Sequence, residues 1–418
     1  MSASGPAGAP GGPVALRWLH VLTAVVEHGS VAQAAAELCL SPSAVSRAVR
    51  QTEAAMGIEL FERGARGMTA LPAARQLALR AQRAHEQLLK ADAAGRARAA
   101  SPRRALRVSQ ITDGMLHALV ATARSGVETV AAATLGVTQP AVHLRLRALA
   151  HLAGTPLVRR TDRGVRLTDA GERWAAAAEL ALSELRVAEE ELAGWRGLAV
   201  GQLAVGALPM AGTELVPRAL GRLLERQPGV QATVADGTYE TLLHLLRHGE
   251  IDLVVGPLRG ALAAADIEEQ TLFVDHLVPV VRAGHPWLGR SKAVLRRGLS
   301  DADWISPLRG SPARAAFEAA FRAAGHGPPA ARLHANSPSV VRALLLQSDR
   351  VALLSPLQVL SDVASGVLAV LPLPLAGTER AIGVTTRRGG LPSPAGQVFM
   401  DELRTVVAEL QLTGDVPV

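Results

Sequence analysis

The sequence predicts a multidomain chain: two small, mainly helical modules in series, each a helix-turn-helix with a wing, then an α/β domain. Three observations predict this fold class. A segment of the N-terminal half recurs at a fixed offset, a long amphipathic stretch follows each copy, and strands alternate with helices from Leu198 onward. The 418 residues are enough for several hydrophobic cores.

The repeat pairs residues 31–50, VAQAAAELCLSPSAVSRAVR, with residues 128–147, ETVAAATLGVTQPAVHLRLR. Matching positions, such as Gly67 and Gly164, are always 97 residues apart, and no insertion is needed. One such unit could be an ordinary pair of alanine-rich helices with solvated arginines. Two units in the same order at one spacing favour two copies of one fold.

The first copy has the features of a helix-turn-helix. Small alanines permit the close helix crossing that the motif requires, and Ser41 is a suitable N-cap for the second helix. Val45 and Val49 face inward on that helix. The outward face, where side chains would meet base edges and phosphates, carries Ser41, Ser43, Ser46, Arg47 and Arg50.

The second copy carries a different outward face. Gln139 can pair with adenine, and His143-Leu144 stands where the first copy has Ser46-Arg47. The sequence therefore predicts an asymmetric operator with two unlike half-sites. The expected contacts of this copy are Thr138, Gln139, Pro140, His143 and Arg147.

A short apolar strand and an Arg-Gly turn follow each outward-facing helix and predict a wing, with arginines directed at backbone phosphates. The second wing is richer in arginine, so we expect the first module to discriminate sequence and the second to anchor on phosphate. The expected phosphate contacts are Arg63, Arg66, Arg160 and Arg163.

Two stretches, 73–94 and 170–195, have apolar residues at near-helical spacing and predict helices of about 30–40 Å each. A polar, basic segment at 95–104 follows the first of them. Beyond residue 198 we expect strands near 203–208, 230–235, 252–256, 276–281, 351–355 and 381–386. Helices are expected near 217–227, 239–248, 313–324, 338–347 and 355–364.

Three motifs carry a family resemblance: SPSAVSRAVRQTEAAMGIELFER, TQPAVHLRLRALAHLAGTPLVRRTDRGVRLTDAG and the run LAVGALPMAGTELVPRALGRLLERQPGVQATVADGTYETLLHLLRHGEIDLVVG. With them, residues 14–418 resemble a LysR-type transcriptional regulator. The resemblance implies winged helix-turn-helix DNA binding and a periplasmic-binding-protein-like effector domain. It also implies that the chain crosses between two lobes near 279–283 and returns near 382–386.

The implied layout departs from the family in having two DNA-binding domains. It comprises a flexible tail (1–13), a first head (14–72), a linker helix and basic linker (73–105), a second head (106–170), a linker helix (171–198) and an effector-binding domain (199–414). In the family, linker helices pair antiparallel across a dimer. We favour an intrachain pseudo-dimer of heads. The alternative is one decayed head and intermolecular dimerisation.

Turns after the expected strands supply candidate effector contacts, since helix N-termini there offer N–H groups to anions. Helix capping is the alternative for each hydroxyl taken alone. Pro209-Met210 favours an apolar or neutral effector, whereas Arg282, His285 and Arg309 would add positive charge. The candidate contacts are Leu208, Met210, Thr238, Ser306, Asn336 and Ser337.

Composition narrows the function. Residues 1–198 hold 24 Lys and Arg against 17 Asp and Glu, whereas residues 199–418 hold 20 of each, so the basic excess coincides with the repeats. Such an excess supports DNA affinity.

The sequence also predicts where the protein is located. No apolar run is long enough for a membrane span, and the N-terminus is unlike a signal peptide. A cytoplasmic location follows. The single cysteine, Cys39, excludes an intrachain disulfide and a multi-cysteine metal site, and its apolar neighbours predict a buried thiol.

The sequence thus favours a DNA-binding transcriptional regulator over two alternatives. A nucleic-acid enzyme would need clustered carboxylates or an activated nucleophile, and a solute-binding protein would need an export signal. No catalytic residue, cofactor or metal is implied. The expected partners are double-stranded promoter DNA, a small-molecule effector, RNA polymerase and, as alternatives, a homo-oligomer or the intrachain pseudo-dimer.

Overall fold

The computed structural model describes residues 16–64, 67–96, 106, 108–162, 164–196, 201–260 and 263–410. They form two compact units. The first comprises the chain up to Gly201 together with Arg247–Glu250, and the second comprises Gln202–Leu246 and the chain from Ile251 onward.

The first head is a helix-turn-helix with a hairpin wing. Ser41 caps its second helix, because the hydroxyl accepts a hydrogen bond from the Ala44 N–H at 3.2 Å. The same helix ends at Gly57 with a φ of 65°, a conformation that favours glycine. The head contains α1 (Leu16–His28), α2 (Val31–Leu38), α3 (Pro42–Met56), β1 (Phe61–Gly64) and β2 (Gly67–Ala70).

The second head repeats this order. It contains α5 (Asp113–Ser125), α6 (Glu128–Thr134), α7 (Gln139–Ala153), β3 (Val158–Thr161) and β4 (Gly164–Leu167), preceded by the 3-10 turn η1 (Val108–Gln110). Each of its helices and strands begins 97 residues after its counterpart in the first head. In both heads the wing strands pair antiparallel. The internal repeat is therefore a repeat of structure.

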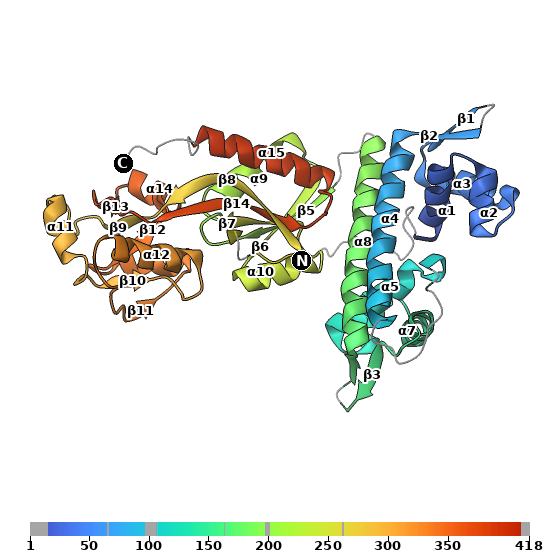
Figure 1. Ribbon diagram of the computed structural model, residues 1–418, viewed down its shortest axis with the longest axis horizontal. Coiled ribbons are helices and arrows are strands. Elements are labelled where there is room, and N and C mark those ends of the chain that lie inside the picture. Colours follow the sequence, from blue (N-terminus) through green and yellow to red (C-terminus); the bar gives the residue numbers. More distant parts are fainter. Residues whose placement is uncertain are drawn as a thin grey trace, which may run out of the picture. The chain divides into compact units, whose positions relative to one another are not determined.

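A long helix follows each wing: α4 (Pro72–Arg96) and α8 (Asp169–Trp195). The two lie side by side and run in opposite directions, as Figure 1 shows. Their alanine-rich faces contribute to one hydrophobic core that also includes both heads. The sequence predicted both helices.

The two heads contact each other at equivalent positions of the repeat. The Leu16 backbone N–H, at the start of α1, donates to the Asp113 carboxylate at the start of α5, at 3.0 Å. These two residues are repeat counterparts, and contact between counterparts is what an isologous interface produces. The hydrogen bond therefore joins equivalent positions of the two heads.

The second unit consists of two α/β lobes, each built on a five-stranded sheet. Lobe I has the strand order β6-β5-β7-β14-β8. Its strands are β5 (Gly201–Ala207), β6 (Val230–Asp236), β7 (Leu253–Pro257), β8 (Ile267–His276) and β14 (Glu379–Arg387). Helices α9 (Leu215–Arg226) and α15 (Pro394–Glu409) pack in one core of this lobe and α10 (Tyr239–Arg247) in another, on the opposite face of the sheet (Figure 1).

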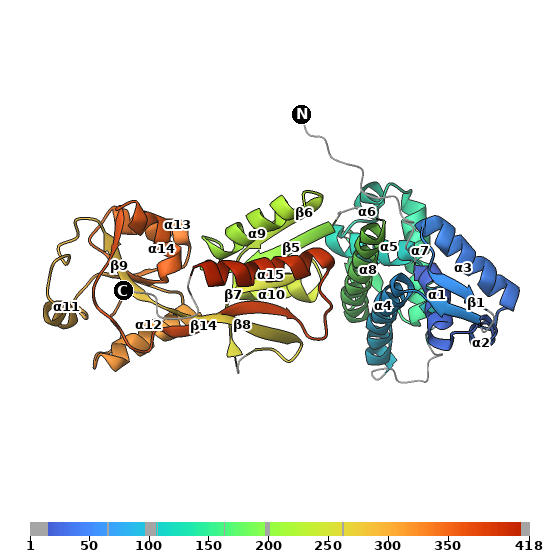
Figure 2. The ribbon, with the colours of Figure 1, turned by 90° about the horizontal axis from the view of Figure 1, so that it is seen from above.

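Lobe II has the strand order β11-β10-β12-β9-β13. Its strands are β9 (Val278–Arg282), β10 (Trp304–Ser306), β11 (Leu333–His334), β12 (Val351–Leu354) and β13 (Leu368–Val370). Helices α11 (Lys292–Gly298) and α12 (Pro312–Ala323) share one core, and α13 (Pro338–Leu346) and α14 (Pro356–Ala364) share a second (Figure 2).

Three sequence expectations were wrong. The chain crosses between the lobes at Leu277, between β8 and β9, and returns between β13 and β14, because the strands are longer than their apolar runs indicated. The residues near 279–283 and 382–386 lie inside strands. The Cys39 thiol is exposed, because this residue ends α2 in the left-handed conformation with a φ of 53°.

Candidate nucleic-acid interface and effector cleft

The recognition helix of the first head, α3, has one buried face and one exposed face. Val45 and Val49 are buried, whereas Ser43, Arg47 and Arg50 are exposed. Arg47 and Arg50 lie one turn apart, so both guanidinium groups can reach the same groove. Ser41, also exposed, caps the helix and shares a hydrogen bond with Ser43 at 3.0 Å between the hydroxyl oxygens, and Ser46 is half-buried.

The recognition helix of the second head, α7, presents a different surface. Leu144, the counterpart of Arg47, is 66% exposed. Pro140 and Arg147 are exposed as well, and Gln139 and His143 are half-buried. Thr138 occupies the N-cap position, but its side chain makes no capping hydrogen bond. The two heads thus keep one backbone and differ in their exposed chemistry.

A buried carboxylate that sequence reasoning missed holds two of these side chains. Gln139 donates from Nε2 to Glu128 Oε2 at 2.5 Å, and His143 Nδ1 lies 3.3 Å from Glu128 Oε1. Glu128 is only 7% exposed. Its first-head counterpart is Val31, and a glutamate at the start of a helix ordinarily indicates only a favourable dipole interaction, so the sequence carried no signal for this role.

The second wing places arginines on the surface. Arg159, Arg160 and Arg166 of the second wing are exposed. The Val165 N–H, in β4, donates to the Gly126 carbonyl at 2.8 Å and ties this wing to the body of its head. Among the other expected contacts, Arg63 lies in β1 with a side chain outside the described residues, and Arg66 and Arg163 lie outside them entirely.

A cleft of about 290 Å³ lies between the two lobes of the second unit. Four of the candidate effector contacts line it: Leu208, Met210, Thr238 and Asn336. Leu208 and Met210 contribute apolar wall and are nearly buried. The Thr238 hydroxyl accepts from the Thr241 N–H at 3.2 Å, so this side chain also stabilises the start of α10.

Two candidates lie elsewhere. Ser306 is the last residue of β10 and not part of a turn; it is fully buried, and its hydroxyl bonds to Arg314. Ser337 precedes α13 and shares a hydrogen bond with Ser339. Neither lines the cleft. Arg282 and His285 are also absent from its lining, and both contact Asp349.

The basic lining of the cleft differs from the one the sequence indicated: Arg309 lines it as expected, and Arg259 and Arg380 line it in place of Arg282 and His285. Asp275 accepts two hydrogen bonds from Arg380, which neutralise that guanidinium. Arg259 lies over the ring of Tyr239, with Cζ 4.2 Å from the centroid. Arg309 is exposed, and no carboxylate or carbonyl within the described residues accepts from it.

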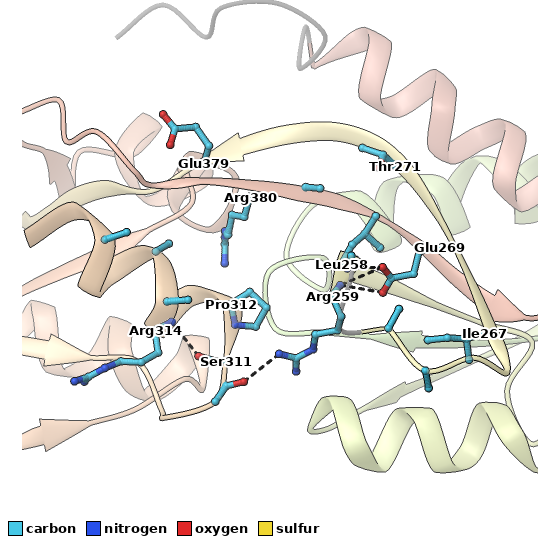
Figure 3. Close-up of a pocket in the computed structure, with 18 of the residues that line it drawn as sticks. Leu258, Arg259, Ile267, Glu269, Thr271, Ser311, Pro312, Arg314, Glu379 and Arg380 are labelled. Carbon is cyan, nitrogen blue, oxygen red and sulfur yellow. Dashed lines mark hydrogen bonds between the residues drawn. The ribbon is translucent and has the colours of Figure 1, made fainter. Parts of the chain in front are cut away.

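Arg259 also borders a second crevice, of about 1650 Å³, which is lined by residues of both lobes (Figure 3). Its guanidinium donates to the Gly310 carbonyl of lobe II at 3.0 Å, and its backbone N–H donates to Glu269 at 2.9 Å. The Arg259 side chain therefore forms part of the wall between the two hollows and links the lobes directly.

Within the described residues, no three His, Cys, Asp or Glu side chains gather as a metal site requires. Among the described helices, none combines the length and apolar character that a membrane crossing needs.

Comparisons with known proteins agree with this architecture. A family model described as "LysR substrate binding domain" matches residues 196–408. A second, "Bacterial regulatory helix-turn-helix protein, lysR family", matches twice, at residues 16–75 and 114–172. The repeated match coincides with the two heads.

Relatives differ in how much of the chain they cover. The HTH-type transcriptional regulator GalR of Pseudomonas putida is 34% identical over 385 residues, which are 92% of this chain and 95% of that protein. PcaQ of Agrobacterium fabrum is 32% identical over 295 residues, 71% of this chain and 94% of that protein. The first alignment is long enough to include both heads, and the second has room for one.

Solved structures share the fold. Full-length LysG from Corynebacterium glutamicum with bound effector Arg aligns with a TM-score of 0.51 and 19% identity, over 71% of this chain and 98% of that one. Full-length CbnR complexed with its target DNA gives 0.50 and 22%, over 70% and 99%. The chain belongs to the LysR family of transcriptional regulators: it is a DNA-binding regulator and not an enzyme, with its helix-turn-helix domain present twice and an effector-binding C-terminal domain.

Proposed function

We propose that the two heads of one chain bind the two unlike halves of a single asymmetric promoter site. The supporting observation is that two recognition helices of different exposed chemistry belong to one packed core. In the first head the contacts are Ser41, Ser43, Ser46, Arg47 and Arg50. In the second they are Thr138, Gln139, Pro140, His143 and Arg147, with Arg63, Arg66, Arg160 and Arg163 on the wings.

The two heads have different roles in DNA binding: the first recognises sequence, and the second contacts phosphates. Arg47 can form a bidentate contact with guanine, which Leu144 at the matching position cannot. The second wing exposes three arginines toward solvent, where they suit phosphate contacts. A salt titration of binding to promoter DNA tests this proposal: affinity should fall steeply with salt for any DNA, and only the promoter should retain tight binding at physiological salt. Binding without salt dependence would contradict it.

We propose further that the effector carries an anionic group and an apolar body. Arg309 offers a guanidinium to the anion, and Leu208 and Met210 offer apolar wall. This departs from the neutral effector that Pro209-Met210 favoured, because Arg259 and Arg380 line the cleft beside the expected Arg309. Arg309→Gln should weaken binding of carboxylate ligands roughly tenfold or more. Arg282→Gln, outside the cleft, is the matched control.

The regulator acts on chromosomal DNA and therefore in the cytoplasm, and it acts together with RNA polymerase. One chain supplies a complete pair of heads, so a second chain is not needed to fill one operator. Light scattering of the complex with a single operator fragment should give one chain per fragment. Two chains on the smallest fragment that binds would contradict this stoichiometry.

A further inference from the structure

Four charged side chains lie where α4 and α8 pack together. We call Arg80, Arg83, Glu184 and Glu191 the linker cluster. Arg80 donates from Nη1 to Glu184 Oε2 at 2.9 Å and from Nη2 to Glu191 Oε1 at 2.7 Å. Arg83 donates from Nε to Glu184 Oε1 at 2.9 Å. The cations all come from α4 and the carboxylates all come from α8.

The centre of the linker cluster is buried. Arg80 is 3% exposed and Glu191 is 5% exposed. Burial lowers the pKa of the Arg80 guanidinium, but the hydrogen bonds and charges of Glu191 and Glu184 outweigh burial and raise that pKa above its ordinary value. A charge buried this far is tolerated only beside its partner, and removing the partner is strongly destabilising.

The repeat identifies what each helix would meet if it paired with its own copy. Because α8 begins 97 residues after α4, the place of Glu184 in an α4–α4 pair is taken by Gln87 of a second copy, and that of Glu191 by Ala94. Neither carries a charge. Glu86 is exposed on α4. Asp92 is itself buried, at 4% exposed, but it takes the helical position of Glu189, which is exposed on α8, so it does not belong to the face that would meet Arg80. Arg80 would then be buried without a carboxylate.

An α8–α8 pair fails for the complementary reason. There the places of Arg80 and Arg83 are taken by Ala177 and Leu180 of a second copy. Glu184 and Glu191 would be enclosed without their cations. Apart from these charges, the two helices present similar alanine- and leucine-rich faces, which by themselves would permit either pairing.

We propose that the linker cluster decides which helices pair: α4 pairs with the α8 of its own chain, and both homotypic pairs with a second copy are rejected. The shared chain favours the internal pair further through its high effective concentration. The two heads are therefore always presented together and in one order. This pairing rule concerns packing alone and holds whatever the heads bind.

Four full-length chains test the rule. The acidic chain carries Arg80→Glu and Arg83→Glu, and the basic chain carries Glu184→Arg and Glu191→Arg. The full-swap chain carries all four changes, and the wild type carries none. Two mixtures, acidic with basic and wild type with full swap, contain the same four helices and differ only in which helices share a chain. Each mixture is co-expressed with two different tags, and the fraction of mixed-tag complexes is measured.

The rule predicts that acidic and basic chains associate about tenfold more than wild type and full swap, because complementary helices meet only between the two chains. Any contact through other surfaces is common to both mixtures. Equal association in the two mixtures overturns the rule. If the half-swapped chains do not fold even together, thermal melting decides: a full swap as stable as the wild type supports the rule, and one as unstable as a half swap overturns it.

Discussion

At the residue scale, the two heads use one backbone with different side chains. At equivalent positions, the first head has Pro42-Ser43 and Ser46-Arg47, and the second has Gln139-Pro140 and His143-Leu144. Burial of Val45 and Val142 fixes which face of each helix is free, and Ser43, Arg47 and Leu144 are exposed on that face, whereas Ser46, Gln139 and His143 are half-buried. The sequence did not predict Glu128, because contact between that residue and Gln139 depends on how α6 crosses α7.

Arg47→Ala should relax base preference at defined positions of the operator, at a cost of about 1–3 kcal/mol in discrimination. Arg160→Ala should instead weaken binding to all sequences similarly and reduce the salt slope by about one. Competition binding with promoter and unrelated DNA at several salt concentrations measures both. Equal losses of specific and nonspecific affinity in Arg47→Ala would show that its role is phosphate anchoring.

Glu128→Val, which gives the second head the residue of the first, should weaken discrimination at the base read by Gln139 by about 1 kcal/mol. The reason is that the Gln139 amide loses the carboxylate that orients it. Nonspecific affinity should rise, since a negative charge near the phosphates is removed. Binding to a set of operators with single-base changes measures the effect. Unchanged preference at every position would contradict the positioning role.

At the element scale, helices α4 and α8 were predicted well, because their apolar spacing is a local signal. The strand β8 and the helix α15 were missed for different reasons. Half of the ten residues of β8 are exposed, and the strand lacks an apolar run. The helix α15 packs against α9, which is far away in the sequence. Local sequence does not indicate that its apolar residues have this partner.

Close packing between the second wing and α8 depends on a glycine. A Cβ at Gly171 would lie 1.9 Å from the Leu157 carbonyl oxygen. Gly171→Ala should therefore destabilise the first unit by roughly 1–3 kcal/mol or more. Gly194, in the same helix, has nothing within 4 Å of an added Cβ, so Gly194→Ala should be neutral or stabilising by about 0.5–1 kcal/mol. Chemical denaturation of the two variants compares them; equal effects would contradict the contact.

A histidine between the heads makes stability depend on pH. Burial, and then the charge of His20, lower the pKa of His85 from its ordinary 6.5 to about 4. The unfolded chain binds a proton below pH 6.5, and the folded chain does so only near pH 4. Stability should therefore fall as pH falls through this window, by about 3 kcal/mol in total.

The matched control is His85→Leu, because Leu182 is the repeat counterpart of His85. Denaturation between pH 7 and 4 should show a smaller loss of stability in this variant than in the wild type. The pKa of His20 and that of His117 are also lowered by burial, so some pH dependence should remain. An unchanged pH profile in His85→Leu would show that other groups account for it.

At the scale of the whole molecule, the central claim is that one chain is an ordered pair of unlike heads on an asymmetric operator. The sequence predicted the two heads from a single offset, and the contact between Leu16 and Asp113 joins equivalent positions of the two heads. The effector cleft was predicted less completely, because Arg259, Arg309 and Arg380 come together only when two lobes meet.

Cys39 permits a direct test of that claim. It is exposed, it lies three residues before α3 of the first head, and its counterpart in the second head is Gly136. An iron chelate attached to this single cysteine will cleave DNA only near the first head. On the smallest operator fragment that binds, cleavage should occur in one half-site only. Cleavage of equal strength in both half-sites would contradict an ordered pair of heads.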